Sequence, residues 1–445
     1  MQRQTTRIPT PPVYHGEPQL QGPDAPDYDN LLACVKCALC LSVCPTYATD
    51  TIEIQGPRGR VQLMRAVDEG ALSLSETVAA HMYHCLDCRA CQTVCPSNVL
   101  VGEQVLHTRA LVEQRRSQPW LKRLILERVM TNPDLLEALV WPARLYQWLG
   151  IQWLVRRSGV LKLLPRTLGS MERLLPPLPR TPLRRKLPEI TPAVGERRYR
   201  VGFFLGCVMS LVFAKTSEKT VRVLAENGCE VVLPKQQRCC GAPHAGEGDV
   251  ATLKQLARHN VDLFLSYDLD YIVADCAACS AQTKEYAELL KDDPVYGERA
   301  HKFANKVRDI TEFLAEIPLK EPLAEVRAKV TYHEACHLCH AQGISKQPRA
   351  VLLSIPGIRL VEMREANWCC GSAGVYNLTH AERATKILDR KMTNVAATDA
   401  DVVAAANPGC LLQLMAGVRE RGLDIKVVHP IDLLAEAYEG GSAER

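Results

Sequence analysis

Residues 34–45 read Cys-Val-Lys-Cys-Ala-Leu-Cys-Leu-Ser-Val-Cys-Pro, and residues 85–96 read Cys-Leu-Asp-Cys-Arg-Ala-Cys-Gln-Thr-Val-Cys-Pro. Both stretches have the same spacing, with three cysteines separated by two residues each and a fourth after three more residues. The proline behind the fourth cysteine cannot continue regular hydrogen bonding, so we expect the chain to turn away there. Three thiols on one tight loop are typical of ligands to a four-iron cluster.

In bacterial two-cluster ferredoxins with this spacing, the fourth cysteine of each run binds the other cluster. The sequence therefore predicts two [4Fe–4S] clusters, the first on Cys34, Cys37, Cys40 and Cys95, and the second on Cys85, Cys88, Cys91 and Cys44. Structural zinc sites are the alternative, but they use two separated Cys-x2-Cys pairs and do not need a third cysteine or Cys-Pro. A disulfide framework does not fit a long chain without a secretory signal.

The composition is that of a soluble globular protein of several domains. The chain has 445 residues, 47% of them hydrophobic, and 19 cysteines, which in a reducing compartment favours metal ligands. Residues 1–28 are polar and rich in proline and read as a flexible leader, with no signal-peptide core. No stretch approaches the roughly 18–20 apolar residues that span a bilayer. We expect a cytoplasmic protein, either free or peripheral on the inner face of the cytoplasmic membrane.

We expect the two-cluster domain over residues 29–110. Between its cysteine runs lies Gly56-Pro57-Arg58-Gly59-Arg60, where Gly-Pro marks a turn and a helical pattern follows. The arginines are either solvated at the start of this helix, or they hold a partner or set the electrostatics of a cluster. The sequence leaves these alternatives open.

A basic helical linker is expected over residues 111–198. From Arg115 to Lys186 it has 15 Lys and Arg residues against 4 Asp and Glu, together with four of the five tryptophans, Trp120, Trp141, Trp148 and Trp153. Basic helices with tryptophan suit an anionic lipid surface or a docking partner. The alternative is a linker packed on its own domains with solvated arginines. Nucleic acid is not expected as a partner, because no recognition motif is present.

Residues 199–440 contain an internal repeat with three cysteine landmarks 129 to 131 residues apart: Cys207 and Cys336, Cys239-Cys240-Gly241 and Cys369-Cys370-Gly371, and Cys279 and Cys410. Expected strands (200–206, 230–233, 271–274, 329–335, 359–362 and 401–405) alternate with expected helices (251–265, 281–290, 382–396 and 411–421). This alternation predicts two α/β modules with largely parallel sheets, over 199–325 and 326–440. The cysteines follow strand ends, where parallel sheets gather functional groups.

The first module offers five thiols, Cys207, Cys239, Cys240, Cys276 and Cys279. Five converging thiols exceed one tetrahedral zinc site and suit an iron–sulfur cluster of unusual shape, although buried cysteines also serve as small hydrophobes. The second module offers Cys336, Cys369, Cys370 and Cys410, with Asn407 where the repeat predicts a cysteine, so a metal there is left open. Cys229 and Cys339 have no counterpart and are expected to be structural.

The stretch from His333 to His337 fits the His-Glu-x-x-His pattern of zinc proteases. That chemistry requires both histidines on one helix, whereas here the residues end an expected strand, so we exclude protease activity. The chain also lacks a P-loop and a Gly-x-Gly-x-x-Gly fingerprint. We expect no catalytic residue and no flavin or substrate site of its own.

The whole chain resembles the iron–sulfur subunit of bacterial glycolate oxidase (glycolate dehydrogenase), in which a two-cluster ferredoxin domain is fused to two cysteine-rich CCG modules. The resemblance is carried by Gly56–Arg60, by Cys369-Cys370-Gly371-Ser372-Ala373-Gly374 with Thr379-His380, and by Asn407-Pro408-Gly409-Cys410. The architecture is also similar to an iron–sulfur subunit of anaerobic glycerol-3-phosphate dehydrogenase and to lactate-oxidising systems. The modules resemble the CCG-containing subunit of heterodisulfide reductase, whose complete motifs hold non-cubane [4Fe–4S] clusters.

This resemblance implies an electron-transfer subunit that receives electrons from an FAD-containing dehydrogenase and passes them toward quinone. The partner would oxidise glycolate or another 2-hydroxy acid. The alternatives are a subunit of a D-lactate or glycerol-3-phosphate dehydrogenase, or a catalytic subunit like heterodisulfide reductase. The first module matches a complete CCG motif, which implies a third iron–sulfur cluster, and the second matches an incomplete one.

Overall fold

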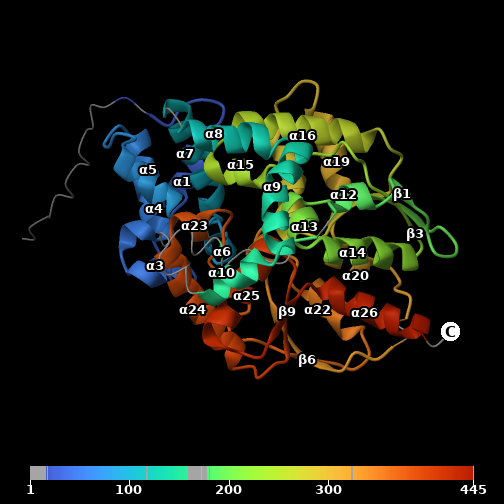
Figure 1. Ribbon diagram of the computed structural model, residues 1–445. Coiled ribbons are helices and arrows are strands. Elements are labelled where there is room, and N and C mark those ends of the chain that lie inside the picture. The colour runs from blue at the N-terminus through green and yellow to red at the C-terminus, as the bar shows by residue number, and fades with distance from the viewer. Residues whose placement is uncertain are drawn as a thin grey trace, which may run out of the picture.

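Figure 1 shows the computed structural model, which describes residues 17, 19–116, 119–158, 172, 178–179, 181–321 and 324–443. Most of the expected leader lies outside these residues, as do parts of the expected linker. Helices make up the N-terminal third, and two sheets with covering helices make up the rest. This arrangement confirms the predicted mixed fold, a helical ferredoxin-type domain followed by two repeated α/β modules.

The ferredoxin-type domain is built from short helices around a small core of Leu31, Met64, Met82 and Val105. Pro45 occupies the first position of α3, where its missing N–H costs nothing, so the chain does turn into a new element after Cys44. The elements are α1 (Tyr28–Leu32), α2 (Leu39–Ser42), α3 (Pro45–Asp50), η1 (Glu53–Gln55), α4 (Pro57–Asp68), α5 (Glu76–Tyr83), α6 (Ala90–Thr93) and α7 (Val101–Arg115).

The described linker is helical and comprises α8 (Trp120–Leu124), η2 (Ile125–Val129), α9 (Pro133–Trp148), α10 (Ile151–Ser158) and α12 (Leu183–Lys186). The side chain of Asn132 caps α9 by accepting hydrogen bonds from the first free backbone N–H groups. In Figure 1, α9 runs down the front of the molecule, where it contacts α13 (Cys207–Val212) of the first module.

The first module is a five-stranded sheet in the order β1-β3-β2-β4-β5, parallel except for β1 at its edge. Its strands are β1 (Ile190–Thr191), β2 (Tyr199–Phe204), β3 (Cys229–Val232), β4 (Tyr271–Ala274) and β5 (Val307–Asp309). Its further helices are α14 (Ala214–Glu226), α15 (Ala242–Glu247), α16 (Val250–Leu265), α17 (Ala277–Lys284), α18 (Tyr286–Leu289), α19 (Gly297–Lys306) and α20 (Ile310–Glu316).

The second module repeats this topology with a parallel sheet in the order β7-β6-β8-β9. Its strands are β6 (Ala328–His333), β7 (Ile358–Val361), β8 (Val402–Ala405) and β9 (Lys426–Val428). Its helices are α21 (Cys336–Cys339), α22 (Lys346–Leu353), α23 (Tyr376–Thr379), α24 (Ala381–Ala396), α25 (Pro408–Arg421) and α26 (Pro430–Ala443).

The two modules pack on each other through equivalent elements. Helix α14 contacts α26, and α20 contacts α22, so each module contributes the same pair of helices to one shared apolar core. In the first sheet, β3 lies on one side of β2 and β4 on the other. In the second sheet, β7 and β8 lie on the two sides of β6 in the same way. The switch point therefore lies between β2 and β4 and between β6 and β8, which is where open α/β sheets bind ligands.

The expected strands and helices around the cysteines are present, with ends shifted by a few residues. The helix expected over 281–290 is divided into α17 and α18, and the short strands β5 and β9 were not expected. In the described part of the chain, no helix is long and apolar enough to cross a membrane.

Candidate metal centres

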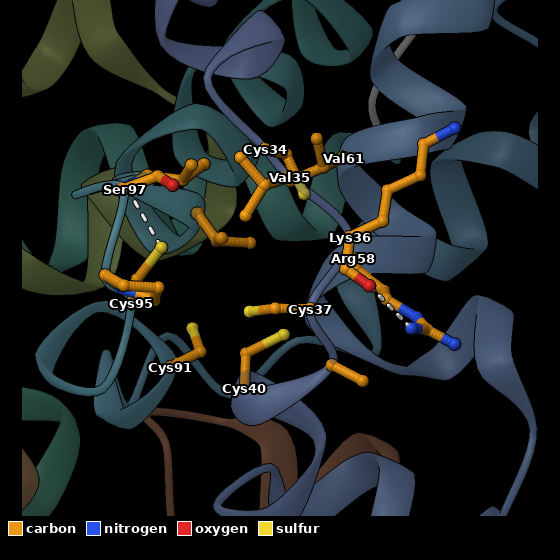
Figure 2. Close-up of a pocket in the computed structure, with 14 residues that line it drawn as sticks. Cys34, Val35, Lys36, Cys37, Cys40, Arg58, Val61, Cys91, Cys95 and Ser97 are labelled. Atoms are coloured by element: carbon orange, nitrogen blue, oxygen red, sulfur yellow. Dashed lines mark hydrogen bonds between the residues drawn. The ribbon is translucent and has the colours of Figure 1, made fainter.

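The thiols predicted to bind the first cluster surround one cavity in the ferredoxin-type domain (Figure 2). Cys34, Cys37, Cys40 and Cys95 all line it, so the second cysteine run does supply its last cysteine to the loop of the first. Cys91 also lines the cavity, which places the two predicted clusters next to each other. The other lining side chains include Val35, Val61, Val99 and Val101. This apolar, sulfur-lined cavity fits an iron–sulfur cluster.

Both cysteine loops adopt the same unusual backbone. Lys36 and Ala38 in the first loop and Asp87 and Arg89 in the second, at equivalent positions, have positive φ angles of 47° to 70°. A left-handed conformation costs a residue with a side chain roughly 1–2 kcal/mol, so it persists only where the surroundings require it. Alternation of left- and right-handed residues turns successive N–H groups inward, and such concavities bind anionic clusters.

The second predicted cluster site lies beside a buried arginine. Arg60, only 1% exposed, donates from Nη2 to Thr46 Oγ1 at 3.1 Å, and Thr46 Oγ1 lies 3.2 Å from Cys44 Sγ. Burial raises the pKa of the Cys91 thiol, Cys85 and Cys44 raise it further, and Arg60 opposes them. Of the alternatives for Gly56–Arg60, the structure therefore supports the electrostatic one for Arg60. Arg58 pairs with Glu53, donates to the Lys36 backbone oxygen at 3.1 Å and lines the first cavity.

Burial favours the protonated thiol at two cysteines of the ferredoxin-type domain, Cys40 and Cys88. It raises the pKa of Cys40 to about 11 and that of Cys88 well above its ordinary value. Metal ligands must be thiolates, so binding of a cluster must release these protons and its positive iron must offset the cost of burying the charges.

The five thiols of the first module converge at the switch point of its sheet. Cys207 follows β2 and lies with its Sγ 3.8 Å from Cys239 Sγ, and Cys276 caps α17 with its Sγ accepting from the Cys279 backbone N–H at 3.4 Å. Hydrogen bonds from the Cys239 and Cys279 thiols lower the pKa of Cys240. Cys240 thus connects the Cys207–Cys239 pair to the Cys276–Cys279 pair, so the five thiols form one continuous group, as expected for a cluster bound by more than four thiols.

Each Cys-Cys-Gly sequence forms a tight turn that needs its glycine. Gly241 and Gly371 both have φ of +87°. A Cβ atom would lie 2.3 Å from the Leu253 side chain at Gly241 and 2.7 Å from the Ala384 carbonyl oxygen at Gly371. In both turns the glycine N–H donates to the sulfur two residues earlier at 3.4 Å, which fixes the first cysteine of the pair.

The second module brings its thiols together with a histidine that the sequence analysis did not select as a ligand. Cys370 Sγ lies 3.4 Å from Cys410 Sγ, and the ring of His333 lies beside them at the end of β6. Lys391 is fully buried in the same region and donates from Nζ to the backbone oxygens of Glu365 and Ala366 at 2.5 and 3.0 Å. His333 ends a strand and His337 lies in α21, so the protease pattern is indeed excluded.

The ferredoxin-type domain contacts both modules next to their cysteines. The neighbouring Cys369 and Cys336 thiols of the second module contribute to the raised pKa of Cys88, and Leu86 packs with Cys369 and Trp368 in one apolar cluster. Toward the first module, the buried Arg109 donates to the backbone oxygens of Cys85 at 2.6 Å and Gly246 at 2.8 Å. The second cysteine run is thus anchored directly to both CCG modules.

Asn407, at the position of the missing cysteine, connects the two modules. Its Oδ1 accepts from the Ala278 backbone N–H at 3.2 Å and lies 3.7 Å from Cys276 Sγ, while its Nδ2 donates to Cys410 Sγ at 3.7 Å. Asparagine therefore separates the thiols of the two modules and hydrogen-bonds both of them.

The structure places the thiols of each predicted set near one another and leaves Cys229 apart from them, whereas the Cys339 Sγ lies 4.0 Å from the backbone oxygen of Cys336. Three residues of these sites were not expected from the sequence: His333, Arg109 and Lys391. For His333 a signal existed, because it stands three residues before Cys336 at the end of a strand that leads into the site. Nothing in the sequence distinguishes Arg109 and Lys391 from cations at the surface.

Comparison with known proteins agrees with this architecture. Residues 30–99 match the family described as "4Fe-4S dicluster domain", residues 201–284 and 330–415 match "Cysteine-rich domain", and residues 117–175 match "Glycolate oxidase iron-sulfur subunit, linker region". Together with the thiol groups, these matches define an iron–sulfur electron-transfer protein made of a dicluster domain, a linker and two CCG modules.

The chain belongs to the family of glycolate oxidase iron–sulfur subunits. It is 40% identical to the "Probable glycolate oxidase iron-sulfur subunit" of Bacillus subtilis, with 92% of this chain and 95% of the relative covered. It is 31% identical to the "Glycolate oxidase iron-sulfur subunit" of Escherichia coli, over 95% and 98%. "Lactate utilization protein A" of Halalkalibacterium halodurans is 32% identical and covers 53% of this chain. The protein is thus an electron-transfer subunit of an oxidoreductase and binds iron–sulfur clusters.

Proposed function

We propose that this protein passes electrons from an FAD-containing subunit, which oxidises glycolate, to quinone at the cytoplasmic face of the membrane. The observation that carries this proposal is the continuity of the thiol groups. Cys88 of the ferredoxin-type domain neighbours Cys369 and Cys336, and Asn407 connects Cys410 to Cys276. Such a series suits a path through the protein better than separate structural sites.

Three sets of thiols would hold the redox groups: Cys34, Cys37, Cys40 and Cys95; Cys85, Cys88, Cys91 and Cys44; and Cys207, Cys239, Cys240, Cys276 and Cys279. The clusters supply one-electron chemistry, and the chain positions them and sets their surroundings. Arg60 beside Cys44 favours the more negative, reduced state of the second set.

The linker provides the surface that we assign to the membrane. Half of the strongly exposed large apolar side chains of the described chain lie in residues 120–154, among them Trp120, Trp141, Trp148 and Trp153, which are 59–75% exposed. Arg157 lies over the Trp153 ring at 5.2 Å, and Arg123 is 66% exposed. Exposed tryptophans next to cations favour the headgroup region of an anionic bilayer.

Replacement of both Trp141 and Trp148 by Ala is expected to lower binding to phosphatidylglycerol vesicles more than tenfold, because the two rings together contribute roughly 2–4 kcal/mol when buried. Flotation of the anaerobically purified complex with vesicles measures this. The matched control is Val295→Ala with Leu353→Ala, which removes apolar groups of similar exposure from the modules. Equal binding of both variants, or no binding of the unmodified complex, would exclude this surface.

The test of the proposed function is anaerobic affinity purification from the native host. We expect a flavoprotein to copurify, and its flavin to bleach with glycolate. Bleaching by lactate or glycerol-3-phosphate instead would keep the electron-transfer role and replace the substrate. A brown preparation without any flavoprotein would reject the proposal.

A second candidate is catalysis at the first module, as in disulfide reduction. A small cavity of about 30 Å³, lined also by Met130, Leu136 and Arg184, adjoins Cys207 and Cys239 and gives a reactant a point of approach to these thiols. Cleavage of a disulfide by the reduced protein during anaerobic turnover would favour this candidate over transfer to quinone.

A further inference from the structure

His333 is a buried histidine whose ring makes no well-aligned hydrogen bond among the described residues. It is 1% exposed, and neither Nδ1 nor Nε2 makes a hydrogen bond of good geometry, although the backbone of Ala366 lies close to the ring. A buried polar group without a partner is costly, and an ion is one of the few explanations for it. One ring nitrogen lies within 4.8 Å of both Cys370 Sγ and Cys410 Sγ.

We propose that the second module holds a single metal ion of the zinc class, bound by His333, Cys370 and Cys410, in place of an iron–sulfur cluster. This site goes beyond the electron-transfer function and does not depend on it. Imidazole with thiolates is a donor set that zinc prefers. The histidine takes over from the cysteine that is missing at position 407.

The spacing of the donors favours one ion over a cluster. With bonds of about 2.3 Å to sulfur and about 2.0 Å to nitrogen, donors around a tetrahedral zinc lie roughly 3.5–4 Å apart. The two sulfurs are 3.4 Å apart, and all three donors lie within 4.8 Å of one another. Among the described residues no other three potential ligands from His, Cys, Asp and Glu are this compact, including the cysteines of the ferredoxin-type domain and the first module.

The repeat supplies an internal comparison. Phe204 occupies the position of His333 in the first module, and Cys276 occupies that of Asn407. At these two positions the first module has a thiol and no imidazole, whereas the second module has an imidazole and no thiol. Asn407 Nδ2 donates to Cys410 Sγ at 3.7 Å, and Lys391 places a cation beside the thiols. Neither residue binds the metal, but both stabilise the negative charge of the thiolate ligands.

Metal analysis of the anaerobically purified complex tests the site. We expect one zinc per chain, and X-ray absorption at the zinc edge is expected to show sulfur donors with one imidazole. His333→Gln is expected to lose at least 80% of the zinc and to keep its iron. The control is His429→Gln, an equally buried histidine of the same module outside the group, which is expected to keep both metals.

Two results would overturn the proposal. One is a complex without zinc whose His333→Gln variant loses iron, since that would mean a cluster at this place. The other is a zinc signal without imidazole, or zinc retained by His333→Gln. If His333→Gln does not fold, the X-ray absorption spectrum of the unmodified complex decides whether the site exists, because only a histidine-bound zinc gives the imidazole signal.

Discussion

Replacement of Cys40 by Ser is expected to lower glycolate-dependent quinone reduction more than a hundredfold, while the flavoprotein still reduces an artificial acceptor at the normal rate. Cys40 lines the cavity with Cys34, Cys37 and Cys95, and a serine hydroxyl is a poor ligand for iron. The change is nearly isosteric, so the loss would come from the missing redox group and not from misfolding. Parallel assays with quinone and with the artificial acceptor separate the two steps.

The control for this variant is Ser42→Ala on the same short helix, α2. Ser42 Oγ donates only to the Leu39 backbone oxygen at 2.8 Å, so its loss costs about 1 kcal/mol at most and leaves the thiols in place. Loss of both activities by Cys40→Ser in an assembled complex would argue against an electron-transfer path. Normal quinone reduction by the variant would show that this set of thiols is not needed.

Replacement of Cys240 by Ser is expected to interrupt the path at a later point. Cys240 lies between Cys239 and Cys279 in the row of five thiols, so its loss removes the centre of the proposed site in the first module. With glycolate, the visible absorbance of the ferredoxin-type clusters is expected to bleach as in the unmodified complex. Quinone reduction is expected to fall more than a hundredfold, and stopped-flow absorbance with a quinone assay measures both.

Cys229→Ser provides the matched control in the same module. Cys229 is a fully buried thiol in β3 that belongs to none of the metal groups, so its replacement tests the cost of a buried hydroxyl alone. That cost is roughly 1–3 kcal/mol of stability, without an effect on electron transfer. If Cys240→Ser reduces quinone normally, electrons leave the protein before the first module.

The pattern of cysteines allowed most of each site to be predicted, because ligand spacing along the chain is set by the geometry of a metal group. The pairing of Cys95 with the loop of Cys34 was expected from the spacing by analogy with two-cluster ferredoxins, and the repeat of the modules from the spacing of their cysteines. The strands β5 and β9 escaped prediction because they have only three residues each and make no distinct pattern. The buried cations Arg109 and Lys391 also escaped, because cations are usually at the surface.

The sequence by itself determined the order of the parts, the thiol sets and the incomplete second module, since all of these depend on residue type and spacing. Only the tertiary structure decided which parts meet. It places Cys88 next to Cys369, and it makes Asn407 bridge Cys276 and Cys410. It also brings His333 to the thiols of the second module. Most of these contacts join residues far apart along the chain, and only the packing of separate elements and domains, which no local pattern encodes, can specify them.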